Sequence, residues 1–194
     1  MPPVTLCLVL INVIVFFVEP QFGDAFIINF ALWPVSAPAP YPTFEPWQVI
    51  TYGFMHSGYE HLAFNMFALY MFGSGLERAF GRSRYLQLYF TAMVTGALTQ
   101  LAVAAAIGGE PVPVIGASGA IFGLLLAFGM YFPHQKIFLY FVVPMPAWVF
   151  VLLYGILELV LGVTGSEAGV AHFAHLGGMV GAWLLVMQWR GKLF

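Results

Sequence analysis

Charged side chains are the scarcest feature of this sequence of 194 residues. Only 7% of the residues are Asp, Glu, Lys or Arg, whereas 61% are hydrophobic, and the mean hydropathy is +0.91. A soluble domain carries roughly 25% charged residues. Because so few charges cannot cover a water-exposed surface, the composition excludes a soluble globular protein and predicts one that lipid surrounds.

Residue types that particular chemistries require are also nearly absent. The single cysteine, Cys7, cannot form an internal disulfide, and the single aspartate, Asp24, excludes a catalytic pair of aspartates. No His-Glu-x-x-His motif of the zinc proteases occurs. The 6 basic residues form no stripe of the kind that binds nucleic acid. We therefore expect no metal, no cofactor and no nucleic acid among the ligands.

What the sequence does contain is a series of long apolar segments. A membrane-spanning helix needs about 20 mostly apolar residues, so this chain can hold about six helices and their loops. We predict an all-α fold, a six-transmembrane-helix bundle that forms a single domain over residues 1–194. The helices are expected at about 4–18, 47–72, 85–107, 116–132, 137–163 and 170–189. A long loop over residues 19–46, rich in proline and aromatic residues, is expected to lie at the lipid–water boundary.

The charges divide between alternate loops of this predicted bundle. The loops after the second and fourth helices and the C-terminal segment hold Arg78, Arg82, Arg84, Lys136, Arg190 and Lys192. The loops after the first, third and fifth helices hold Glu19, Asp24, Glu45, Glu110 and Glu167. Because basic loops remain in the cytoplasm, we expect both termini there, in a bacterial plasma membrane. The N-terminal ends of the second, fourth and sixth helices then face the outer side.

Ser118 lies at the N-terminal end of the fourth predicted helix. Gly116 lets the backbone bend into that helix, and the free N–H groups of a first helical turn can bind developing negative charge. Gly119 and Gly123 form a ridge of small residues that a second helix can approach closely. Taken alone, Ser118 is also compatible with a small residue at a helix contact.

His175 is the base that best fits Ser118. Gly178 and Ala182 follow it on the same helix face and form a second smooth ridge, so packing of the two ridges would bring Ser118 and His175 within hydrogen-bond reach. An ionisable residue inside a membrane is a functional candidate, although a lone buried histidine is often structural. His172 is interpreted as a polar cap or a residue that supports the site.

A third polar group lies on the second predicted helix. His61 and Asn65 are four residues apart and share a helix face. Their side chains can donate hydrogen bonds into one pocket, as the oxyanion of an acyl-transfer reaction requires. Without the serine and histidine, a polar clamp between helices would be an equally good interpretation.

Three motifs together resemble those of the rhomboid intramembrane serine proteases, and the resemblance covers nearly the whole chain. The motifs are Gly116-Ala117-Ser118-Gly119, Ala174-His175-Leu176-Gly177-Gly178 and His61-Leu62-Ala63-Phe64-Asn65. The resemblance implies a six-helix core that cleaves transmembrane protein substrates in the lipid bilayer, near its outer face. The loop after the first helix would be the family's membrane-inserted loop, and the fifth helix would form the substrate gate.

The resemblance also implies roles for particular residues. Ser118 would be the nucleophile and His175 the general base and acid, as a dyad without an acidic third member. His61, Asn65 and the backbone N–H of Ser118 would form the oxyanion hole. Phe122 stands where many members have a tyrosine that stacks on the histidine, and it can still stack.

The sequence departs from the family's pattern at two further places. Trp47-Gln48 stands where Trp-Arg is frequent, and Glu77-Arg78 stands in place of Glu-x-Arg. Neither departure removes a catalytic group.

Two other functions stay open from the sequence. A catalytically silent relative could bind transmembrane client proteins in the same groove. A transporter or proton channel could use His56, His61, His175 and Glu158, but the charged residues form no file across the membrane and no inverted repeat is visible. Glu158 receives no role from the sequence.

Overall fold

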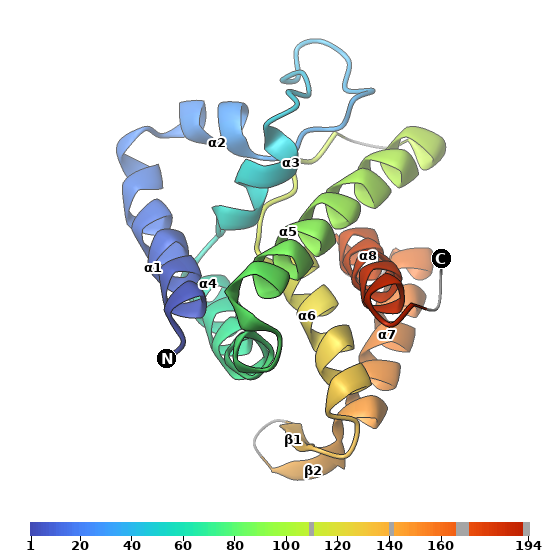
Figure 1. Cartoon of the computed structure of the whole chain (residues 1–194). Helices are drawn as coiled ribbons and strands as arrows, with labels where there is room; N and C mark the ends of the chain where they lie inside the picture. Colours follow the sequence, from blue (N-terminus) through green and yellow to red (C-terminus); the bar gives the residue numbers. More distant parts are fainter. Residues whose placement is uncertain (109–110, 140–141, 166–170, 192–194) are drawn as a thin grey trace.

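The structure, a computed structural model, is mostly helical and describes residues 1–108, 111–139, 142–165 and 171–191 (Figure 1). The helices are α1 (Pro3–Val18), α2 (Asp24–Phe30), α3 (Gln48–Thr51), α4 (Tyr59–Ala68), α5 (Ser74–Ile107), α6 (Ser118–Tyr131), α7 (Ala147–Thr164) and α8 (His172–Trp189). An antiparallel hairpin pairs β1 (Lys136–Leu139) with β2 (Val143–Pro146). The expected helix residue Val170 and the loop charges Glu110, Glu167 and Lys192 lie outside the described residues.

The second and third long helical segments are joined at a single residue. A π-helical turn over Leu69–Gly73 carries α4 into α5 without a break, and Gly81, at φ 77°, then interrupts α5. Glycine adopts this backbone region without the steric cost of a side chain. Within the described residues the long helical segments therefore number six: α1, the two segments on either side of Gly81, α6, α7 and α8.

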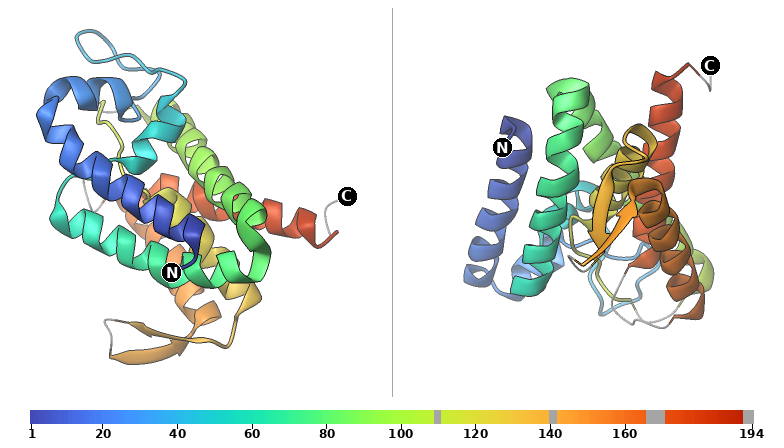
Figure 2. Two further views of the ribbon diagram at one scale, coloured as in Figure 1. Left: turned by 60° about the vertical axis from the view of Figure 1, so that its left-hand side comes forward. Right: turned by 90° about the horizontal axis from the view of Figure 1, so that it is seen from below.

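The centre of the bundle is formed by α5, α6 and α8, which pack on one another more extensively than any other helices (Figures 1 and 2). Small residues permit this close approach. A Cβ at Gly178 would collide with the carbonyl of Gly119, and a Cβ at Gly123 would lie 2.8 Å from the carbonyl oxygen of Gly178. The two small-residue ridges predicted from the sequence thus face each other across α6 and α8.

The outer helices carry the exposed apolar surface. Among the described residues, three helical stretches are long and apolar enough to cross a membrane: Pro3–Gln21, Tyr59–Ile107 and Ala147–Thr164; α6 is a shorter apolar helix. Leu152, Ile156 and Val163 of α7 are all about half exposed or more, as expected for side chains that face lipid. The predicted fold class, a helical bundle of a polytopic membrane protein, is confirmed.

Two predicted helices begin in the wrong place. The second helix was expected at 47–72 but starts at Tyr59, because residues 47–58 form α3, a 3₁₀ turn at Tyr52–Phe54 and an irregular connection. This helix then continues to Gly81, through residues that were expected to form a loop. The fifth was expected at 137–163 but starts at Ala147 after the hairpin. Prolines at 144 and 146 lack the N–H that a helix interior needs, whereas a strand edge and a helix start tolerate them.

The segment expected as a long loop over residues 19–46 contains α2 and is held by Gln48. The Gln48 side-chain oxygen accepts hydrogen bonds from the backbone N–H groups of Trp33 and Glu45, both at 3.2 Å. Trp47 donates its ring N–H to the carbonyl of Asn29 at 2.9 Å. The Trp47-Gln48 pair therefore ties this segment to the start of α3.

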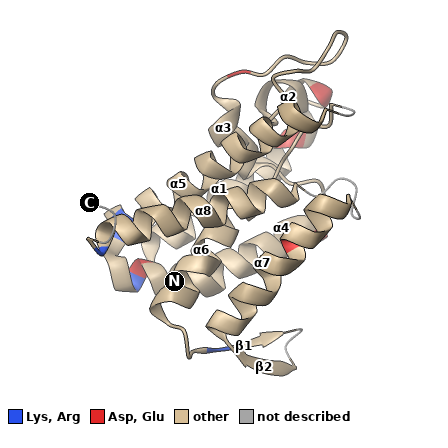
Figure 3. Ribbon diagram, turned by 90° about the vertical axis from the view of Figure 1, so that its right-hand side faces the viewer, with Lys and Arg blue, Asp and Glu red and all other residues tan. Residues whose placement is uncertain are grey.

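Charges of opposite sign gather toward different ends of the described chain (Figure 3). Lys and Arg lie near the C-terminus and at β1, whereas carboxylates lie around α2. Glu77 lies at the basic end and Glu158 lies within α7, so both are exceptions to this division.

Candidate active site

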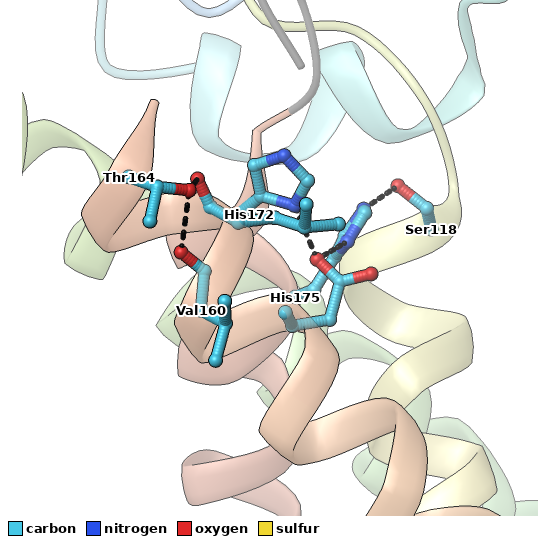
Figure 4. A network of polar contacts seen from close by, with 7 residues as sticks. Ser118, Val160, Thr164, His172 and His175 are labelled. Carbon is cyan, nitrogen blue, oxygen red and sulfur yellow. Dashed lines mark hydrogen bonds and ion pairs between the residues drawn. The ribbon is translucent and has the colours of Figure 1, made fainter. Parts of the chain in front are cut away.

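The two predicted reactive side chains are in contact. Ser118 is the first residue of α6, His175 is the fourth residue of α8, and Ser118 Oγ lies 2.7 Å from His175 Nε2 (Figure 4). This is a short hydrogen-bond distance between a hydroxyl and an imidazole nitrogen. The hydroxyl can therefore donate its proton directly to the ring, which is the geometry that activates a serine.

Gly116 shapes the backbone that presents Ser118. Its φ is 126°, and its N–H donates to the carbonyl of Tyr52 at 2.9 Å. A Cβ at this position would lie 2.9 Å from both Cε1 and Nε2 of His61 and 3.6 Å from Ser118 Oγ. Only glycine therefore lets the His61 ring approach this turn.

Phe122 packs against the base. It lies one turn after Ser118, and its ring stacks on the His175 ring with centroids 4.3 Å apart and 8° between the planes. This contact limits rotation of the imidazole, so that Nε2 stays directed at Ser118.

His61 and Asn65 of α4 complete the polar lining. The backbone N–H of Ser57 donates to His61 Nδ1 at 3.3 Å, so the neutral His61 ring carries its proton on Nε2, the nitrogen beside Gly116. Asn65 donates one side-chain hydrogen to the carbonyl of His61 at 3.0 Å and has a second to offer.

His56 supports the His61 ring from outside this lining. The two rings make an edge contact with centroids 4.9 Å apart, and His56 is 2% exposed. Burial, with a smaller effect from the neighbouring His61, lowers the pKa of His56 to about 4. His56 is therefore a neutral packing partner at neutral pH.

A carboxylate that had no role in the sequence-based prediction lies on the far side of the base. Glu158 Oε2 of α7 lies 2.8 Å from His175 Nδ1 and 2.7 Å from His172 Nδ1. All three side chains are buried. The resemblance implied a dyad without an acidic member, but the structure places an acid next to His175.

These three side chains are also the group that could hold a metal ion among the described residues, since their ligand atoms lie within 4.8 Å of one another. Ligands on one tetrahedral zinc are about 3.3 Å apart, given metal–ligand bonds near 2.0 Å. The nitrogen–oxygen distances of 2.7 and 2.8 Å are those of hydrogen bonds instead. We therefore interpret the cluster as hydrogen-bonded, and the absence of a metal stays a prediction.

Two cavities meet at Ser118. One, of about 440 Å³, lies beneath the connections that precede α6 and α8 and is lined by Ser57, His61, Asn65, Ser118 and His175 among others. The other, of about 450 Å³, runs between α4, α6, α7 and β1. Its lining is mostly apolar and includes Phe64, Phe122 and Phe150, together with Ser118 and Asn65. Ser118 can thus be reached from a polar side and from an apolar side.

Sequence reasoning missed two residues around this site. Glu158 could have been found, because it is a carboxyl in an apolar helix and the next helix along the chain carries two histidines, His172 and His175, at i,i+3 spacing. Tyr52, whose hydroxyl donates to the carbonyl of Met93 at 2.8 Å and whose carbonyl holds Gly116, had no signal in the sequence.

Comparisons with known proteins point in one direction. A family model described as Rhomboid domain matches residues 43–190. The chain is 38% identical over 143 residues to "Rhomboid protein 1, mitochondrial" of Saccharomyces cerevisiae, across 67% of this chain and 38% of that protein. It is 32% identical over 139 residues to "Rhomboid protease GluP" of Bacillus subtilis, across 71% of this chain and 25% of that protein.

The match to a third similar protein extends over a larger share of both chains. "Rhomboid protease AarA" of Providencia stuartii is 29% identical over 210 residues, across 91% of this chain and 68% of that protein. By contrast, the chain spans well under half the length of the first two relatives.

Proposed function

The chain belongs to the rhomboid family, and on that premise we propose that it is an intramembrane serine endopeptidase that cleaves transmembrane proteins. The observation that carries the proposal is the 2.7 Å contact between Ser118 Oγ and His175 Nε2. Relatives named as rhomboid proteases support the same reaction class.

The proposed reaction proceeds through an acyl-enzyme. Ser118 Oγ attacks the scissile carbonyl while His175 Nε2 takes the hydroxyl proton, and the protonated ring then gives that proton to the leaving amine. A water molecule, deprotonated by the same nitrogen, hydrolyses the ester and regenerates Ser118. Phe122 keeps the ring in the orientation that all of these steps need.

The oxyanion is the group that needs stabilisation in both steps. His61 Nε2–H, the second side-chain hydrogen of Asn65 and the backbone N–H of Ser118 are the proposed donors. Two contacts support this assignment: Ser57 holds the His61 proton on Nε2, and Gly116 leaves room for that ring beside the serine. A preorganised donor of this kind is worth about 10²- to 10³-fold in rate.

The two cavities support a division of access. The apolar cavity between α4 and α7 suits a transmembrane segment that enters from the lipid, and the polar cavity suits water. With both termini in the cytoplasm, as the charge pattern predicts, the polar cavity opens toward the outer side, and cleavage occurs near that end of the substrate helix.

Labelling with a serine-directed fluorophosphonate, together with cleavage of a transmembrane reporter, tests the proposal. In detergent or liposomes, the wild type should be labelled and active, and Ser118→Ala and His175→Ala should lose both properties. Ser83→Ala, which changes an exposed serine of α5, is the matched control and should behave like the wild type.

Two results would count against an enzyme. Full activity of Ser118→Ala would remove Ser118 as the nucleophile. A wild type that binds transmembrane clients but is neither labelled nor active would instead establish the catalytically silent binder.

A further inference from the structure

Glu158 is a buried acid that has no role in the reaction as proposed above. It projects from α7 toward α8, and its side chain is 9% exposed. One of its oxygens, Oε2, lies 2.7 Å from His172 Nδ1 and 2.8 Å from His175 Nδ1. A carboxylate buried in apolar surroundings is costly unless hydrogen bonds satisfy it, so these contacts explain how an acid is accommodated here.

The geometry determines which ring nitrogens carry protons. An ionised carboxylate oxygen only accepts hydrogen bonds, so both Nδ1 atoms must donate to it. A neutral His175 ring with its proton on Nδ1 has its lone pair on Nε2, the atom that contacts Ser118 Oγ at 2.7 Å. The opposite tautomer would direct an N–H at the serine and could not take its proton.

We propose that Glu158 is the positioning residue of His175, because the carboxylate of α7 and the imidazole of α8 lie 2.8 Å apart on the side of the ring opposite Ser118. Ser118, His175 and Glu158 then form a serine–histidine–glutamate triad spread over three helices. The carboxylate holds the reactive tautomer and stabilises the imidazolium that forms when the serine proton moves. This inference rests on the proposed function.

His172 has a separate part in this arrangement. As the first residue of α8 it shares the face of His175 at i,i+3, and it supplies the second donor to the same oxygen. Two donors fix the position of that oxygen better than one. His172 thereby supports the carboxylate and does not contact Ser118.

The decisive variant is Glu158→Gln, which keeps the shape of the side chain and removes its charge. We expect the kcat/KM of reporter cleavage to fall about 10- to 100-fold, part of the 10²- to 10⁴-fold that a general base contributes. Fluorophosphonate labelling should slow by a similar factor. Glu158→Asp, which keeps the charge on a shorter side chain, should recover part of the loss.

The pH profile separates positioning from a merely structural tie. The titratable groups that face His175 in the described residues are Glu158 from α7, His172 from α8 and His61 from α4. Without the carboxylate, the protonated ring loses its ion partner. The acid limb of the rate profile of Glu158→Gln should therefore move to lower pH than that of the wild type.

Met179→Ala is the matched control for packing between α7 and α8, because Met179 of α8 is buried and lies against Gly155 of α7. Loss of this buried side chain should lower stability and leave the pH profile in place. Equal losses of rate in Met179→Ala and Glu158→Gln, with the wild-type profile in both, would overturn the inference. So would a Glu158→Gln variant with the wild-type rate.

The two proposals fail in different ways. An inert wild type overturns the proposed function and this inference with it. An active wild type whose Glu158→Gln variant is equally active, with the same pH profile, overturns the inference alone.

Discussion

At Gly116, one hydrogen atom in place of a side chain decides whether His61 can lie beside Ser118. The Gly116→Ala change adds a Cβ that would lie 2.9 Å from the His61 ring. It also places alanine at φ 126°, a strain of about 1–3 kcal/mol. If the displaced ring is an oxyanion donor, kcat should fall about 10²- to 10³-fold.

Gly108→Ala separates the steric effect of that change from backbone strain. Gly108 also has a positive φ, 73°, but a Cβ there meets nothing within 4 Å. Reporter cleavage and thermal unfolding should therefore show lower stability in both variants and a large loss of kcat only in Gly116→Ala. Equal kcat in the two variants would contradict the role given to His61.

The individual site residues were predictable to different degrees. Ser118, His175, His61 and Asn65 could be singled out because polar groups at the ends of apolar helices are few. The contact between Ser118 and His175 was inferred from glycine spacing, and the grouping of His61 with Asn65 from their i,i+4 spacing. The contact of Glu158 could not be predicted, because its partner depends on how α7 rotates against α8, and an almost wholly apolar helix gives no signal about its rotation.

Among the elements, the first turn of α1 is hydrogen-bonded to α5 through one side chain, Glu77. Glu77 accepts hydrogen bonds from the backbone N–H of Val4 at 3.0 Å and from the N–H and hydroxyl of Thr5 at 2.7 and 2.8 Å. The carboxylate thus satisfies free N–H groups of the first turn of α1, where negative charge is also favoured. Although Glu77-Arg78 departs from the family's pattern, Glu77 therefore has a structural role in holding the first turn of α1.

The Glu77→Gln change should detach the N-terminal end of α1. An amide presents one acceptor oxygen and an NH₂ group that cannot accept, so at least one donor loses its partner. We expect the free energy of unfolding to fall by about 2 kcal/mol, measured by denaturation in detergent. Glu60→Gln, at an exposed position of α4, is the control and should leave stability nearly unchanged. An equal effect of the two changes would refute this account of Glu77.

Element boundaries were harder to predict than element identity. Apolar runs identified the long helices, but Gly81 ends one helix and starts the next with no polar loop between them. The hairpin before α7 was missed because residues 137–146 are as apolar as a helix. In a membrane protein, strand and helix are equally hydrophobic, so composition alone does not separate them.

For the whole molecule, the division of charge predicts its orientation. Ser36, in the segment before α3, and Ser83, next to Gly81, are both exposed. In a Cys7→Ser background, Ser36→Cys should react with a membrane-impermeant maleimide on intact cells, and Ser83→Cys only after lysis, because the basic end stays in the cytoplasm. The opposite pattern would invert the proposed side of cleavage. Equal labelling of Ser36→Cys and Ser83→Cys on intact cells would contradict the prediction that these positions lie on opposite sides of the membrane.

The meeting of two cavities at Ser118 has a consequence for the order of events. In a protease with one entrance, the departing peptide must leave before water can arrive. Here the hydrophobic fragment can remain in the passage between α4 and α7, while hydrolysis proceeds from the opposite mouth. If the chain cleaves transmembrane segments as proposed, release of the cut membrane anchor into lipid is a step separate from hydrolysis, and a more fluid bilayer should speed that step without altering the chemistry.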